Sequence, residues 1–255
     1  MKPRISLFWF RRDLRLDDNA GLYQALKSGY PVLPLFIFDR NILDQLENRS
    51  DRRVEFIHNT IADLKDRLQR SGATMEVHYG HPAAIFRHLL ATYDIAAVYT
   101  NTDYEPYATE RDAEIRILLG AQNIPFHSYK DHVIFEKNEV LKDDGSPYTV
   151  FTPYSRKWRS KMDDFYLSSY PIKKYHRHFL QQEPGPMPAL AAMGFAASGE
   201  SFPPPAIHSD LLKNTTSSGI IPPSPARAGS GCIFASALSA SGNSHERRPR
   251  LAIPI

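Results

Sequence analysis

Short apolar runs alternate with longer amphipathic stretches along the first half of the chain. Five of these runs predict β-strands: Ile5–Phe10, Val32–Phe38, Thr74–Tyr79, Ile95–Thr100 and Ile124–Tyr129. Strands that are apolar on both faces and alternate with helices are typical of a parallel sheet covered on both sides. The pattern therefore predicts an α/β fold built on a five-stranded parallel sheet with helices on both faces.

The stretches between the runs carry helix signals. In Asp51–Arg70, apolar residues recur at steps of three and four, which predicts one helix with a single buried side. Further helices are predicted at Ala20–Lys27, after the capping cluster Asp17-Asp18-Asn19, at Ala83–Thr92, opened by His81-Pro82, and at Thr109–Leu119. Ligands bind at the carboxyl ends of parallel strands. We therefore expect function in the loops at Phe8–Arg12, Phe38–Arg40, Tyr79–Pro82 and Asn101–Tyr107.

The character of the chain changes after the fifth strand. Val150–Met162 is aromatic and basic; it could contact phosphates, but such a cluster more often marks an amphipathic helix that packs its aromatic side inward. Gln181–Pro188 is a proline-rich linker. Between Lys213 and Glu246 the only charged residue is Arg227, so we expect a disordered tail there.

Composition excludes several classes of protein. A single cysteine among 255 residues excludes an internal disulfide framework and a multi-cysteine metal site, and we expect no metal. The sequence contains neither a G-x-G-x-x-G fingerprint nor a phosphate-binding P-loop. No apolar stretch is long enough to cross a bilayer and the start does not resemble a signal peptide, so a cytoplasmic location is expected. The net charge of +3 permits a nucleic-acid partner without arguing for one.

Two loops carry candidate chemistry. In Trp9–Asn19, three arginines stand among three aspartates, and the simplest interpretation is a salt-bridged loop that satisfies its own charges. In Asn101–Asp112, Asp103 and Glu105 alternate in an extended segment before a proline, so both carboxylates could point into the crevice. They could serve acid–base chemistry or accept hydrogen bonds from a ring-bearing ligand. The alternative is that this segment only opens the next helix, at Thr109 and Glu110.

Several segments in matching order carry a family resemblance: WFRRDLRLDDNAGL, VLPLFIFD, a G-H-P turn, NTDYEPYATERD and TVFTPYSRKW. Together they resemble the amino-terminal part of the DNA photolyase/cryptochrome family. The resemblance implies a Rossmann-like antenna-chromophore domain, a linker, and a helical domain that binds FAD and damaged DNA and performs light-driven electron transfer. The implied function is the light-harvesting domain of a deoxyribodipyrimidine photolyase, which repairs pyrimidine dimers.

The resemblance also implies site residues. Asp103 and Glu105 match acidic positions that hydrogen-bond a deazaflavin antenna in one branch of the family. The folate-binding branch has an Asn-Glu pair where this chain has Tyr107-Ala108, so a deazaflavin is expected rather than a reduced folate. Phe10, Arg11, Asp39 and Tyr107 are the remaining candidates for cofactor binding, although the arginines are expected to be mainly structural. No catalytic residue is expected in this chain.

The flavin-binding signature that the family should show near Asn214 is absent. Ser218–Asn243 can be back-translated so that the shifted frame spells that signature, and we infer a frameshift near 214–218. The expected organisation is an antenna domain at 1–132, an interdomain linker at 133–198, a remnant of the FAD domain at 199–213 and an out-of-frame tail at 214–255. Without the FAD site, repair by this chain alone is not expected and DNA binding should be weak or absent.

Two other functions remain open at this point. The chain could be a stand-alone module that binds a nucleotide or a flavin in the same crevice. It could also be a cryptochrome-like signalling fragment that acts through partner contacts. A bound near-ultraviolet chromophore would favour the antenna domain or the binding module, and a colourless protein would favour the signalling fragment.

Overall fold

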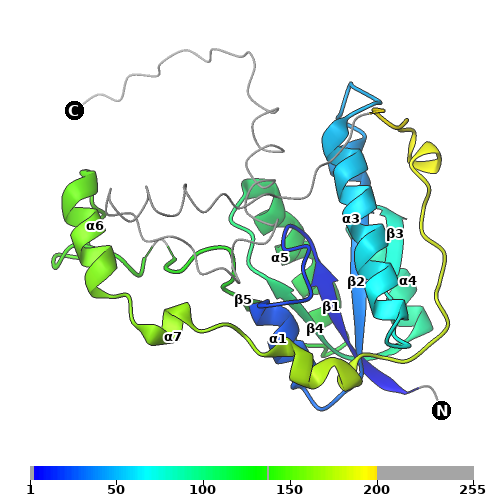
Figure 1. The fold of residues 1–255 in the computed structure, drawn as a ribbon, viewed down its shortest axis with the longest axis horizontal. Helices are drawn as coiled ribbons and strands as arrows, with labels where there is room; N and C mark the ends of the chain where they lie inside the picture. Colours follow the sequence, from blue (N-terminus) through cyan, green and yellow to red (C-terminus); the bar gives the residue numbers. More distant parts are fainter. Residues whose placement is uncertain (1–2, 137, 200–255) are drawn as a thin grey trace.

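The structure, a computed structural model, describes residues 3–136 and 138–199. Its centre is a five-stranded sheet in the order β3-β2-β1-β4-β5, in which every neighbouring pair is parallel (Figure 1). The strands are β1 (Arg4–Phe10), β2 (Val32–Asp39), β3 (Glu76–Gly80), β4 (Asp94–Asn101) and β5 (Phe126–Tyr129). The predicted fold and all five predicted strands are confirmed.

The order of the strands places a switch point beside the central strand. The chain runs from β1 outward to β2 and β3, and then crosses back to β4 on the other side of β1. Helices that follow on the two sides of such a switch diverge and leave a crevice at the carboxyl ends of the strands. The loops that follow β1, β2 and β4 therefore meet at one edge of the sheet.

Helices cover both faces of the sheet, as predicted. The seven α-helices are α1 (Ala20–Leu26), α2 (Arg40–Leu43), α3 (Arg52–Gln69), α4 (Pro82–Thr92), α5 (Pro106–Gly120), α6 (Phe151–Ser160) and α7 (Asp164–Leu167), among the residues described. α1 and α3 pack on one face, and α4 and α5 on the other. Alternate side chains of β1 pack into hydrophobic cores on opposite faces of the sheet: Phe8 packs under α1 and α3, and Trp9 under α4 and α5. α5 begins at Pro106, three residues before the predicted start at Thr109.

A close contact joins α1 to β4. Asn19 caps α1 as predicted, because its side chain accepts a hydrogen bond from Leu22 N at 3.0 Å. Gly21 N donates to Asn101 Oδ1 at 2.7 Å. A Cβ atom on Gly21 would lie 2.6 Å from that oxygen, so only glycine fits here without a shift.

The last part of the segment predicted as an interdomain linker, residues 170–198, packs along the α/β body. Five of its side chains are buried: Ile172, Phe179, Leu180, Met193 and Phe195. Leu180 N donates to Val32 O at 2.8 Å, and Lys65 Nζ on α3 donates to Gly185 O at 2.6 Å. The segment runs past the base of the sheet and then along α3 (Figure 1). Residues 170–198 thus form an ordered strap that contributes to the core.

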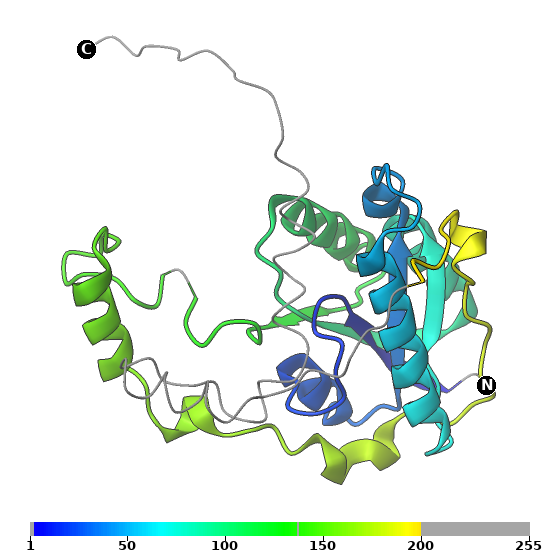
Figure 2. The same ribbon diagram turned by 45° about the horizontal axis from the view of Figure 1, so that its top comes forward.

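The aromatic–basic segment forms a helix but does not pack inward, so that part of the prediction is wrong. None of the α6 residues is buried, and the Phe151 side chain is 75% exposed. In both views α6 stands apart from the sheet (Figure 1, Figure 2). Trp158 makes an edge-on contact with Phe135 at 5.7 Å between ring centroids, so its partner is local. The main core is complete without α6.

Some expectations concern parts that the structure does not describe. The remnant at 199–213, apart from its first residue, and the tail at 214–255 lie outside the described residues. Within the described part of the chain, no helix is long and apolar enough to cross a membrane. The same residues contain no cluster of histidine, cysteine or acidic side chains suited to a metal ion.

Candidate functional site

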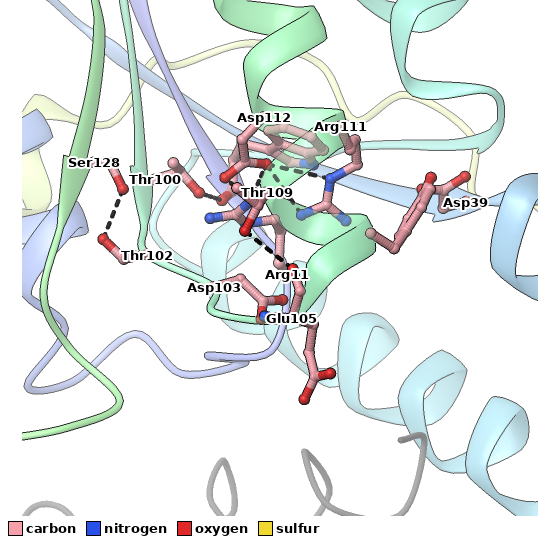
Figure 3. A network of polar contacts seen from close by, with 12 residues as sticks. Arg11, Asp39, Thr100, Thr102, Asp103, Glu105, Thr109, Arg111, Asp112 and Ser128 are labelled. Carbon is pink, nitrogen blue, oxygen red and sulfur yellow. Dashed lines mark hydrogen bonds and ion pairs between the residues drawn. The ribbon is translucent and has the colours of Figure 1, made fainter. Parts of the chain in front are cut away.

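The arginines after β1 form ion pairs with acidic side chains from distant parts of the chain. Arg11 Nη1 lies 2.6 Å from Asp112 Oδ2 on α5 (Figure 3). Arg12 Nη1 lies 3.0 Å from Asp103 Oδ1 after β4. Arg15 Nη2 lies 2.7 Å from Asp131, which follows β5. The predicted self-contained salt-bridge loop is therefore wrong. The loop instead ties together the carboxyl ends of three strands.

Arg11 belongs to a buried cluster below the crevice. Its side chain is 5% exposed and also donates to Asn101 O. The guanidinium groups of Arg11 and Arg111 lie 5.2 and 4.8 Å from the centre of the Trp9 ring, and both pair with Asp112. Burial lowers the pKa of Arg111, and the positive charge of Arg11 lowers it further. Arg11 is thus buried and fully engaged with protein groups, as expected for an arginine with a structural role.

Asp103 and Glu105 lie around one arginine but differ in exposure. Arg12 Nη1 is 3.0 Å from Asp103 Oδ1 and 3.6 Å from Glu105 Oε1. The Asp103 side chain is 8% exposed, whereas that of Glu105 is 49% exposed. Burial alone would raise the pKa of Asp103, but the charges of Arg12 and Arg11 and the hydrogen bonds from Glu105 N and Arg12 together outweigh burial, and the pKa lies below its ordinary value. Figure 3 shows Glu105 reaching away from the buried cluster.

Asp39 and Tyr107 meet at the end of β2. Asp39 is buried and caps α2, since its Oδ1 accepts from Asn41 N at 3.0 Å. The Tyr107 hydroxyl, which comes from α5, donates to Asp39 Oδ2 at 2.5 Å. Burial, together with this bond to the carboxylate, raises the pKa of Tyr107 to about 12. The hydroxyl therefore stays a donor at neutral pH.

Phe10 does not lie on the crevice surface. Its side chain is fully buried and packs edge-on against Phe8, with 4.6 Å between ring centroids. Among the candidates from the sequence, the crevice edge therefore brings together four polar side chains: Asp39, Asp103, Glu105 and Tyr107. Ionised carboxylates only accept hydrogen bonds, so this edge suits a ligand that presents N–H or O–H groups.

Two neighbours of this edge, Asn41 and His81, were not among the predicted binding residues. His81 holds the N-cap position of α4 without a side-chain capping bond, although capping was its predicted role. Its Nδ1 instead lies 2.9 Å from Asn41 Oδ1. Both residues line a depression of about 370 Å³, together with Pro82, Ala83, Tyr107, Glu110, Arg111 and Glu114. No local signal reveals these contacts, because they form only where α2, α4 and α5 converge.

Comparison with protein families gives a match over most of the described chain. The family model described as DNA photolyase matches residues 6–174. A deoxyribodipyrimidine photo-lyase of Halobacterium salinarum is 30% identical over 208 residues, which cover 78% of this chain and 43% of the relative. An uncharacterized 31.6 kDa protein of Synechococcus is 35% identical over 158 residues, covering 62% of this chain and 55% of the relative. Cryptochrome-1 of Drosophila melanogaster is 32% identical over 146 residues, covering 55% of this chain and 27% of the relative.

Solved structures show the same fold. A class III photolyase of Agrobacterium tumefaciens aligns with a TM-score of 0.62 at 23% identity, over 75% of this chain and 38% of that chain. An archaeal photolyase of Sulfolobus tokodaii aligns with a TM-score of 0.55 at 26% identity, over 71% of this chain and 42% of that chain. The latter structure is described as holding two FAD molecules, with the implication of a novel light-harvesting cofactor. The chain spans between 27% and 55% of the length of these relatives.

Proposed function

Because the chain belongs to the DNA photolyase family, we propose that it is the light-harvesting domain of an enzyme that repairs pyrimidine dimers in DNA. The family binds chromophore cofactors and acts on damaged DNA. The candidate site lies where an α/β sheet of this topology takes its ligand, at the switch point between β1 and β4. The observation that carries the proposal is the half-exposed Glu105 carboxylate beside the buried Asp103–Arg12 pair at this switch point.

Asp103 and Glu105 have different roles in this proposal. Asp103 neutralises Arg12 and is nearly buried, so it fixes the loop in place. Glu105 lies near the same guanidinium, but half of its side chain faces solvent, so it is the acid that contacts the chromophore. Asp39, at the end of β2, supplies a second acceptor. Phe10 and Arg11 support the site from below.

We favour a deazaflavin as the chromophore over a reduced folate. An edge of carboxylates fits the N–H and O–H groups of a flavin-like ring and its side chain. Tyr107-Ala108 stands where the folate-binding branch has its Asn-Glu pair. FAD is the competing ligand, because a relative that is 26% identical is described with two FAD molecules. A chromophore held by Glu105 and Asp39 would supply absorption of near-ultraviolet light.

A titration of the full chain with three probes tests the proposal. Deazaflavin, FAD and a reduced folate are added separately, and binding is followed by absorbance and fluorescence. We expect deazaflavin to bind most tightly and Glu105→Gln to weaken it by about tenfold, the effect of losing one hydrogen bond to a charged group. Glu183→Gln is the matched control, because Glu183 is exposed and lies close in sequence to Leu180, which bonds to Val32 at the start of β2 and thus at the opposite edge of the sheet. Absence of binding by all three probes refutes the proposal.

Repair is proposed for the longer proteins of the family and not for this chain alone. The photolyases among the relatives extend well beyond the part that this chain matches. We propose that 1–132 form the antenna domain, that 133–198 connect it to the region holding FAD and DNA, and that the protein acts in the cytoplasm. A repair assay with damaged DNA, added FAD and light should therefore show no activity. Repair above the rate in the dark contradicts this division.

A cryptochrome-like signalling role is the second candidate. The similarity to a Drosophila cryptochrome supports it, because the matching region is the same. The exposed aromatic face of α6 is a surface on which a partner could bind. A purified chain that is colourless and binds no chromophore in the titration would favour this role over light harvesting.

A further inference from the structure

Hydrogen bonds connect the exposed imidazole of His81 to the buried carboxylate of Asp39. His81 Nδ1 lies 2.9 Å from Asn41 Oδ1, and Asn41 Nδ2 donates to the Tyr107 hydroxyl at 3.0 Å. That hydroxyl donates to Asp39 Oδ2 at 2.5 Å. The four side chains come from the N-cap of α4, from α2, from α5 and from the end of β2. They therefore converge from separate elements on one carboxylate.

The chemistry of the groups fixes the direction of every bond. A carboxylate only accepts, so the Tyr107 hydroxyl donates its hydrogen to Asp39. The hydroxyl oxygen then accepts from the Asn41 amide nitrogen, which leaves the amide oxygen to accept from His81. His81 must carry a proton on Nδ1. We call this series of hydrogen bonds, from His81 through Asn41 and Tyr107 to Asp39, the relay. Every donor in it points toward Asp39.

The relay does more than the helix cap requires. Capping of the four-residue α2 uses only Asp39 Oδ1, which accepts from Asn41 N. Tyr107 holds the other oxygen from across the crevice. In the described part of the chain, each oxygen thus has one assigned donor and keeps a second lone pair for a further one. Asn41, His81 and Tyr107 also line the adjoining depression, so the held carboxylate lies next to open space.

We propose that Tyr107 and Asn41 are positioning residues that fix the orientation of the Asp39 carboxylate toward the donor groups of the chromophore. This inference rests on the proposed function. Tyr107 acts directly through its hydroxyl, and Asn41 acts through Tyr107. Neither residue needs to touch the chromophore to set its affinity.

The test compares deazaflavin affinities of the wild-type chain and three variants, with FAD as the probe if the wild type binds it more tightly. Tyr107→Phe removes only the hydroxyl and should raise Kd about tenfold. Asn41→Ala leaves the backbone bond to Asp39 intact and should raise Kd about threefold. The double variant should match Tyr107→Phe alone, because Asn41 acts through the hydroxyl. The absorption maximum of the bound chromophore should shift in all three variants.

A matched control separates positioning from general stability. The Tyr104 hydroxyl, in the loop between β4 and α5, donates to Glu136 Oε1 at 2.9 Å. Tyr104→Phe should therefore leave both Kd and the bound spectrum unchanged. Melting temperatures of all variants are measured alongside.

Each outcome has a defined meaning. If the wild type binds the probe and Tyr107→Phe binds it equally well with the same spectrum, the inference is overturned and the proposed function stands. Additive effects of Asn41→Ala and Tyr107→Phe overturn the relay, because they show independent action. If the wild type binds no probe, the proposed function fails, and the inference fails with it.

Discussion

Replacing Gly21 with alanine tests the junction between α1 and β4. A Cβ atom at this position would lie 2.6 Å from Asn101 Oδ1 and 3.0 Å from both the Phe8 ring and the carbonyl oxygen of Thr100. Two of these neighbours belong to β4 and one to β1. The helix must move away from the sheet or the Asn101 side chain must rotate, and either change breaks the bond from Gly21 N to Asn101.

The magnitude follows from three contributions. Loss of one buried hydrogen bond costs about 1 kcal/mol. Overpacking against a strand costs about 1–3 kcal/mol. Alanine favours the helix by about 1 kcal/mol relative to glycine, which offsets part of the loss. The net expectation is a decrease of about 1–3 kcal/mol in the free energy of unfolding.

Urea unfolding of the full chain, followed by circular dichroism, measures this change. Gly120→Ala is the matched control: Gly120 is also a helical residue, but a Cβ there would meet nothing within 4 Å. The control should be neutral or more stable by up to about 1 kcal/mol. A Gly21→Ala variant as stable as the wild type would refute the close contact between α1 and β4.

Two further predictions concern acid stability and the strap. The pKa of Asp103 is lowered on folding, so its contribution to stability is present above the ordinary carboxyl pKa and is lost as pH falls through the folded value. Asp103→Asn should therefore lose less stability than the wild type between about pH 5 and pH 2 in urea titrations, and a parallel profile would contradict the pairing with Arg12. Phe179→Ala should cost about 3–5 kcal/mol because the ring is buried. Phe151→Ala on exposed α6 should stay within about 0.5 kcal/mol, and equal losses in the two variants would show that the strap does not belong to the core.

Local patterns were sufficient to predict the sheet and its helices. Runs such as Val32–Phe38 are apolar on both faces, which only a covered strand satisfies, and α3 follows a regular helical period. The start of α5 was missed because a proline at the first helical position was interpreted as a bend. These errors are local and small.

The partners of the polar groups could not be predicted from the sequence. Arg11 and Asp112 are 101 positions apart and meet only after β1 and β4 have paired. Nearer acids in the same loop looked equally suitable, because charge alone does not select a partner. The burial of Phe179 was hidden for a similar reason: the short stretch around it shows no helical or strand periodicity, and its packing depends on the surface against which it lies.

The strap determines where the described chain departs from the α/β body. Its last anchors are the bond from Ala196 N to Arg49 O and the bond from Ser198 N to Glu55 Oε2, at 2.8 Å each, at the amino-terminal end of α3. That end of α3 lies on the same edge of the sheet as Asp39. A module tethered at this point begins its path beside the crevice, and its local concentration there is set by the tether and not by diffusion. The chromophore that we propose for this crevice and any module joined after residue 199 would thereby lie within short range of each other.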